Sequence, residues 1–84
     1  LSNKTILIQF DDYGMDGMRC DYRGNIYLAR YGKGVISVID KTGNLLNEIP
    51  LHGKNPTNIT FPKGSNKEIY ITIQDKKWVE KIIF

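Results

Sequence analysis

Short apolar stretches with alternating side chains, separated by residues typical of turns, run along the whole chain. The first stretch, 5–10, places Ile6 and Ile8 on one face and Leu7 on the other, which is the period of a β-strand. Gly, Asn and Asp residues lie between the stretches and tolerate chain reversal, as at Gly24-Asn25. The predicted strands are 5–10, 17–21, 25–30, 35–40, 45–49, 57–61, 68–73 and 77–84. Because no window combines helical spacing with caps at both ends, we predict an all-β fold.

The predicted strands repeat. Ile26-Tyr27-Leu28 recurs 43 residues later as Ile69-Tyr70-Ile71, and Gly24 and Gly64 each close the turn after a short strand. Four short antiparallel strands that recur at about this period are typical of a β-propeller blade. We therefore predict that residues 1–84 form part of a β-propeller, about two four-stranded blades. Its parts would be 16–50 as one blade, 56–84 as most of the next, and 5–10 as the outer strand of the preceding blade.

The middle strands carry apolar side chains on both faces, with Ile26 and Leu28 on one and Tyr27 and Ala29 on the other. Neighbouring blades cover both faces of a blade, whereas a strand that faces water alternates more cleanly with polar residues. Two blades alone would leave large apolar faces exposed. We expect the rest of a propeller, or self-association, to cover them. Three copies would supply six blades, with the strand at 5–10 pairing across chains.

Composition and charge limit the kinds of partner that the chain is expected to bind. The chain has 84 residues and a net charge of +3, and its basic residues are scattered, so nucleic-acid binding is not expected. No apolar stretch approaches the length of a membrane span and no signal peptide is evident, which favours a cytoplasmic protein without membrane contacts. The chain does not begin with Met, which suggests a piece of a longer protein. The single cysteine, Cys20, is expected to be a buried thiol.

Five segments in order resemble one family, the gluconolactonase and senescence-marker-protein (regucalcin) group of six-bladed propellers. Residues 16–29 are similar to its "PDGMxxDxxGNLYVA" motif, and 32–40 to "GGxVxVxD". The remaining segments are 43–51, similar to "GxLLxEIPLP", 56–61, similar to "PTNxxF", and 69–72, similar to "LYVT". The likeness covers nearly all of this chain but only about the last third of the family's usual length. Met15 departs from the pattern, because the family commonly has Pro there.

The resemblance implies a metal-dependent hydrolase of sugar lactones. In that family a divalent cation in the central tunnel is held by a Glu of an early blade, an Asn of a middle blade and the Asp of this motif, which is Asp16 here. Asp16 would then be a metal ligand and the general base, with a lactone as substrate. Calcium is the expected cation, and zinc or magnesium are the alternatives. The other two ligands have no counterpart in this chain, and a calcium ion takes six or more oxygens.

Simpler interpretations of these candidate residues remain as alternatives. A lone carboxylate at the start of a strand is usually a solvated loop residue. Asp11 and Asp12 lack the spacing of a calcium loop and are expected to be solvated turn residues. Asn58, on the inner strand of the second blade, either binds substrate near the tunnel or caps a turn. The alternative functions are a non-catalytic binding or scaffold propeller and an inactive fragment that self-associates.

Overall fold

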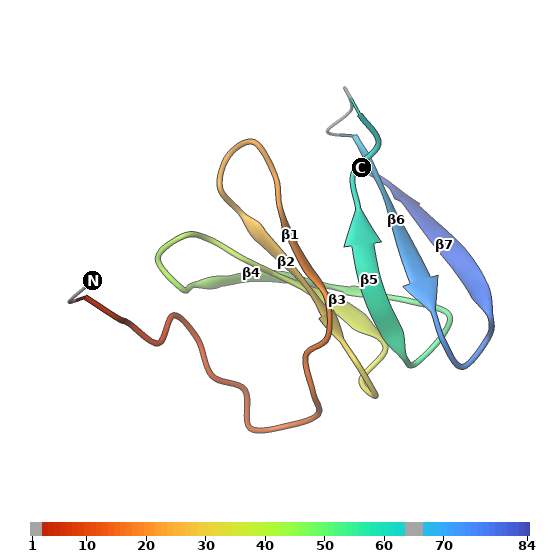
Figure 1. Cartoon of the computed structure of the whole chain (residues 1–84), viewed down its shortest axis with the longest axis horizontal. Coiled ribbons are helices and arrows are strands. Elements are labelled where there is room, and N and C mark those ends of the chain that lie inside the picture. The colour runs from red at the N-terminus through yellow and green to blue at the C-terminus, as the bar shows by residue number, and fades with distance from the viewer. Residues whose placement is uncertain (1–2, 64–66) are drawn as a thin grey trace.

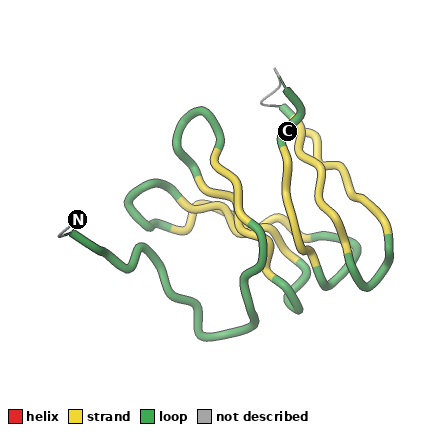
Figure 2. The backbone as a smooth tube through the Cα atoms, viewed as in Figure 1, coloured by secondary structure: helices red, strands yellow, loops and turns green. Residues whose placement is uncertain are grey.

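Two antiparallel sheets lie side by side in the computed structural model, which describes residues 3–63 and 67–84 (Figure 1). The first sheet has the order β1 (Met18–Cys20), β2 (Ile26–Arg30), β3 (Val35–Ile39) and β4 (Leu45–Pro50). The second has the order β5 (Pro56–Thr60), β6 (Glu68–Ile73) and β7 (Trp78–Ile83). Loops and turns make up the rest of the described chain, which holds no helix able to span a membrane (Figure 2). The all-β prediction and the division into two successive sheets are confirmed.

The repeat found in the sequence is also a repeat of hydrogen-bonding register. Ile26 pairs with Ile39 across β2 and β3, and 43 residues later Ile69 pairs with Ile82 across β6 and β7. The two sheets are therefore successive copies of one strand pattern. The turn assigned to Gly64 lies outside the described residues.

A short turn motif closes two hairpins of the first sheet. Oδ1 of Asp21 accepts the backbone N–H groups of Arg23 and Asn25, each at 2.9 Å, and Gly24 adopts the left-handed φ of 86°. Glycine enters that region without the steric penalty that a side chain would bring. The turn 40–44 repeats the same Asp-x-x-Gly-Asn arrangement with equivalent bonds from its backbone to the aspartate.

The prediction that residues 5–10 are the outer strand of a preceding blade stays a prediction, because the described residues hold no other strand of such a blade. The structure assigns those residues to no strand, and the side chain of Ile6 is 81% exposed. The segment instead follows the far side of the first sheet, where Leu7 lies against Gly43 and the ring of Phe10 lies 3.7 Å from the guanidinium of Arg30. A strand needs a hydrogen-bonded neighbour, and none lies beside this segment in the described residues. The alternation of apolar residues can be read from the segment itself, whereas a strand partner has to come from another part of the polypeptide.

The core fills the space between the two sheets. Fully or nearly fully buried side chains there are Ala29, Ile36 and Val38 from the first sheet and Ile59, Ile69, Ile71 and Ile73 from the second. Tyr27 extends this core, and its ring meets that of Phe61 edge to face at 5.1 Å. Burial of one face of each sheet against the other holds the pair together.

Cys20 is exposed, which corrects the prediction of a buried thiol. It lies in β1, which pairs with β2 on one side only and forms the edge of its sheet. Strand alternation alone does not tell whether a second layer covers the face on which a side chain lies.

Candidate functional site

Asp16 lies immediately before the first strand, and β2 fixes its backbone. The N–H of Asp16 donates to the carbonyl of Ala29 at 2.8 Å, and the N–H of Ala29 donates to the carbonyl of Gly17 at 2.9 Å. The side chain of Asp16 is exposed, and within residues 3–63 and 67–84 its carboxylate makes no hydrogen bond or ion pair. The chain thus holds the main chain of this residue firmly while leaving its carboxylate available.

Gly17 allows the start of the first sheet to touch the second. Its N–H donates to the carbonyl of Thr57 at 2.8 Å. A Cβ on residue 17 would lie 2.6 Å from that carbonyl oxygen and 2.9 Å from Cα of Asn58, closer than real Cβ contacts. Only glycine fits this approach of two backbones. The contact brings Asp16 next to β5.

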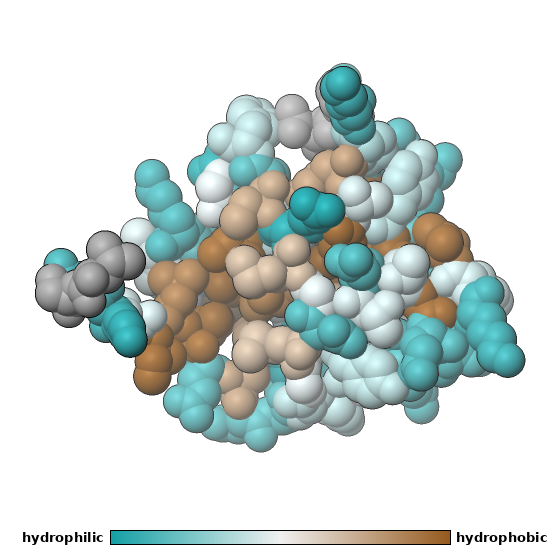
Figure 3. Space-filling model, in the orientation of Figure 1, coloured by the Kyte–Doolittle hydropathy of each residue, from teal (hydrophilic) through white to brown (hydrophobic). Residues whose placement is uncertain are grey.

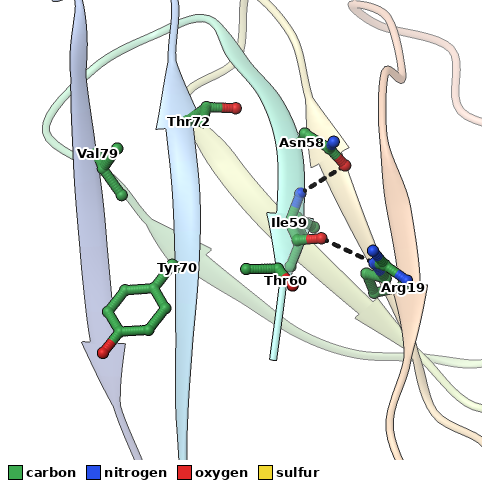
Figure 4. A pocket seen from close by; sticks show the side chains of 7 residues that line it. All are labelled: Arg19, Asn58, Ile59, Thr60, Tyr70, Thr72 and Val79. Carbon is green, nitrogen blue, oxygen red and sulfur yellow. Dashed lines mark hydrogen bonds between the residues drawn. The ribbon is translucent and has the colours of Figure 1, made fainter. Parts of the chain in front are cut away.

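Asn58 lies on the other side of that contact. Its amide oxygen accepts the N–H of Ile59 at 2.9 Å and lies 2.9 Å from where a Cβ of Gly17 would be (Figure 4). This leaves the amide NH₂ as a donor. The side chain is exposed and lines a cleft of about 250 Å³ on the outer face of the second sheet, together with Thr72 and Val79. The two candidate residues are neighbours through Gly17, and the described structure does not join their side chains by a hydrogen bond.

The donor atoms near Asp16 suit a hard cation in kind but not in number. A carboxylate and an amide oxygen are the ligand types that calcium prefers, and calcium takes six to eight of them. Among the described residues no three His, Cys, Asp or Glu side chains gather in one place. The side chains of Asp16 and Asn58 alone supply fewer oxygen atoms than calcium takes.

A buried arginine that the sequence did not single out anchors the loop before Asp16. The side chain of Arg30, at the end of β2, is 0% exposed. Its Nη2 donates to Oδ1 of Asp12 at 2.8 Å, and its Nε donates to the carbonyl of Gly14 at 3.0 Å. Such charge-assisted bonds are stronger than neutral ones. Arg30 thus fixes the loop that leads into Asp16.

Further charges complete this anchor. Nζ of Lys33 lies 3.3 Å from carboxylate oxygens of both Asp12 and Glu48, and the Ser37 hydroxyl donates to Glu48 at 2.9 Å. The hydrogen bond from Arg30 lowers the pKa of Asp12 below its usual value. Asp12 is an exposed residue of a bend, as predicted, and its carboxylate in addition pairs with Arg30 and Lys33. An acidic residue 18 positions before an arginine carries no local signal of this pairing.

Comparison with known proteins shows the family to which the chain belongs. The family model described as the SMP-30/gluconolactonase/LRE-like region matches residues 1–75. An uncharacterized protein of Sulfolobus acidocaldarius is 31% identical over 75 residues, which cover 86% of this chain and 27% of that protein. The chain thus spans about a quarter of the length of this relative.

Two solved structures resemble the fold. Regucalcin of Agrobacterium tumefaciens, described as a calcium-binding protein, matches with a TM-score of 0.75 and 30% identity over 84% of this chain and 25% of its own. Virginiamycin B lyase of Staphylococcus aureus matches with a TM-score of 0.59 and 18% identity over 84% of this chain and 27% of its own. The second likeness is one of fold alone. The regucalcin match confirms the predicted resemblance and the propeller architecture.

Proposed function

Because the chain belongs to the SMP-30/gluconolactonase/LRE-like family, we propose that it forms part of a propeller that hydrolyses sugar lactones with a divalent cation. Asp16 is the proposed cation ligand and general base. Asn58 is the proposed contact to substrate. The remaining blades and ligands come from polypeptide beyond these 84 residues or from further copies of the chain.

The observation that carries the proposal is the placement of Asp16. Its backbone is fixed by Ala29, and Gly17 presses the same turn against β5. Its carboxylate is exposed and unpaired within the described part of the chain. A fixed main chain with an uncommitted carboxylate is what a ligand or a base requires.

The chemistry follows from the donor types. A divalent cation, when bound, polarises the lactone carbonyl for attack by water. The Asp16 carboxylate accepts a proton from that water and returns it to the ring oxygen as the acyl C–O bond of the lactone breaks. The amide NH₂ of Asn58 donates a hydrogen bond to an oxygen of the sugar ring or its hydroxyl groups. Calcium is the favoured cation, because the regucalcin that this chain resembles is described as calcium-binding. Zinc and magnesium are the alternatives to compare.

The test is hydrolysis of glucono-1,5-lactone by the assembled propeller that contains this sequence. Asp16→Asn keeps the shape of the side chain but removes its charge and basicity, and we expect the rate to fall by at least about a hundredfold. Removal of divalent cations by a chelator should abolish the rate, and added calcium should restore it.

Asp11→Asn is the matched control. Asp11 is an exposed carboxylate in the loop leading to Asp16 and makes no interaction within the described residues, so its change should leave the rate intact. Undiminished hydrolysis by Asp16→Asn would refute the assignment. A wild-type propeller that binds a sugar lactone without hydrolysing it would support the non-catalytic binding module instead.

A further inference from the structure

The loop before β1 holds one residue in an uncommon backbone conformation. Tyr13 has a left-handed φ of 50°, a region that a bulky side chain rarely enters. Among residues 3–63 and 67–84 the other non-glycine residue with a positive φ is Lys77, whose N–H donates to the Gln74 carbonyl at 3.3 Å within the tight β6–β7 turn. Tyr13 precedes the first strand and belongs to no hairpin of the described chain. Its conformation is therefore imposed by its surroundings, and such outliers gather at binding sites.

The buried Arg30 holds both chain neighbours of Tyr13. Nη2 of Arg30 donates to the carbonyl of Asp12 at 2.6 Å, and its Nε donates to the carbonyl of Gly14 at 3.0 Å. The N–H of Gly14 also donates to the carbonyl of Tyr31 at 3.2 Å. The backbone is thus fixed on either side of Tyr13, while the Tyr13 side chain takes no part in these bonds.

The ring of Tyr13 lies against the turn between β2 and β3. Its Cδ1 is 3.1 Å from where a Cβ of Gly32 would be, so a side chain at residue 32 would displace the ring. Gly32 also has a φ of 87°, which favours glycine at this place. The ring therefore rests on backbone at this point, and Tyr13 as a whole is 66% exposed. The loop presents an aromatic ring in a fixed place.

Tyr13 and Asp16 lie on the same rim of the molecule. This rim consists of the loop 10–17, the β2–β3 turn, the β4–β5 loop and the β6–β7 turn, which all lie toward the lower side of Figure 1. Mainly hydrophilic and near-neutral residues coat that side in the same orientation (Figure 3). The N–H groups of Gly14 and Asp16 both donate to carbonyls at the end of β2 or just beyond it. The ring and the carboxylate thus belong to one short segment with a fixed backbone.

The loop before the second sheet shows that this part of the rim stays open to solvent. Lys54 lies 41 residues after Tyr13, in the loop that leads into β5. Its carbonyl accepts the N–H of Gly32 from the first sheet, and its own N–H donates to Asp75 in the β6–β7 turn. Although a sheet lies on each side of it, the Lys54 side chain is exposed. The exposure of Tyr13 therefore follows from its place on the rim.

We propose that the Tyr13 ring is a platform on which the sugar ring of the substrate packs, beside the Asp16 carboxylate, a role that rests on the proposed function. A six-membered sugar ring has faces of C–H groups, which are apolar and weakly positive, and the face of an aromatic ring is apolar and negative. The hydroxyl groups of the sugar then point toward the polar rim. An apolar surface with a few polar groups beside it is the usual composition of a small-molecule site.

The first experiment measures the binding of 1,5-anhydroglucitol, a six-membered sugar ring without a lactone carbonyl, to the assembled propeller that contains this sequence. Tyr13→Gly removes the ring and tolerates the left-handed φ, so the loop can keep its course. We expect its dissociation constant to rise about three- to tenfold. Tyr13→Phe keeps the ring and should stay within about twofold of the wild type.

Tyr22→Gly is the matched control. Tyr22 is 68% exposed, close to the value of Tyr13, but it lies in the turn 21–25 at the opposite end of β1 from Asp16. Its change should leave the binding of 1,5-anhydroglucitol as it is in the wild type.

The second experiment distinguishes a platform from a purely structural role. Calcium affinity and kcat for glucono-1,5-lactone depend on Asp16, so Tyr13→Gly should leave both within about twofold while KM rises. Unchanged sugar binding by Tyr13→Gly, or no sugar binding by the wild type, would overturn the inference. A parallel loss of calcium affinity would also overturn it, because the ring would then serve only to hold the loop. A propeller that binds 1,5-anhydroglucitol through Tyr13 but does not hydrolyse the lactone would support the platform and refute only the proposed hydrolysis.

Discussion

The two sheets share one strand register but differ in what covers them. The first sheet is covered on one face by the second sheet and on the other by its own N-terminal segment, so even Arg30 and Ser37 are fully buried. Within residues 3–63 and 67–84 the second sheet is covered on one face only, and the residue equivalent to Ile36 is the exposed Val79. Two sheets with the same pattern of hydrogen bonds therefore differ in how many of their faces are buried. Because the two sheets have the same strand register, the difference in burial comes from what packs on each face.

The two sheets also carry different residue types at one equivalent buried position. At the end of β2 the chain uses Arg30, bound to Asp12, and at the equivalent place at the end of β6 it uses Ile73, packed against Gly53. A buried charge is tolerated where hydrogen-bond acceptors surround it. The charged version occurs in the sheet that carries Asp16, where it ties down the loop before that residue.

The largest expected effect on stability distinguishes the buried face of the first sheet from the exposed face of the second. Ile36→Ala removes a fully buried side chain from the core and should lower the free energy of unfolding by about 2–5 kcal/mol. Val79→Ala, at the equivalent position of the second sheet, should change it by less than about 0.5 kcal/mol, because Val79 is 62% exposed. Urea unfolding followed by circular dichroism measures both. Equal losses would mean that Val79 is covered within a single chain, contrary to the structure.

A smaller effect is expected at the contact between the sheets. Gly17→Ala forces a Cβ against the Thr57 carbonyl, so the sheets must move apart, and we expect a loss of about 1–3 kcal/mol. Gly14→Ala is the control, because the nearest atom to its Cβ would be the Tyr31 carbonyl oxygen at an ordinary 4.0 Å. Thermal and urea unfolding compare the two. Similar stability of the two variants would show that the approach at Gly17 is not close.

The smallest expected effect concerns the turn 40–44 of the first sheet. Hydrogen bonds from the backbone N–H of Asn44 and from Thr42 lower the pKa of Asp40 to about 2. Because the folded pKa lies below the unfolded value, this carboxylate stabilises the fold above about pH 4, and its contribution is lost as the pH falls toward about 2. Asp40→Asn should therefore flatten the decline in unfolding free energy between these pH values. An unchanged decline would show that the turn does not hold the ionised carboxylate.

Local patterns were enough to predict seven of the strands and the turns between them. Alternating apolar residues and the Asp-x-x-Gly-Asn motif act over a few neighbours, so the sequence displays them directly. The buried thiol predicted for Cys20 was wrong, because burial depends on what lies beside the strand in space. The strand predicted at 5–10 depends on neighbouring strands of a preceding blade and stays a prediction.

The same limit applies to the candidate site. The motif resemblance singled out Asp16, and the place of Asn58 on the predicted inner strand made it a candidate. The structure brings Gly17, the neighbour of Asp16, against Asn58, and the roles of both residues stay predictions. The anchor between Arg30 and Asp12 was missed, because the two residues are far apart in sequence and meet only after the loop folds onto β2. Long-range pairing of charges has no local sequence signal.

The central claim is that Asp16 serves as a cation ligand in the assembled propeller. Isothermal titration with calcium tests it most directly, on the wild type and on the Asp16→Asn and Asp11→Asn variants. The claim predicts that Asp16→Asn weakens calcium binding by at least about tenfold, since affinity follows the number of charged ligands, while Asp11→Asn binds as the wild type does. Equal calcium affinity in all three proteins would contradict it.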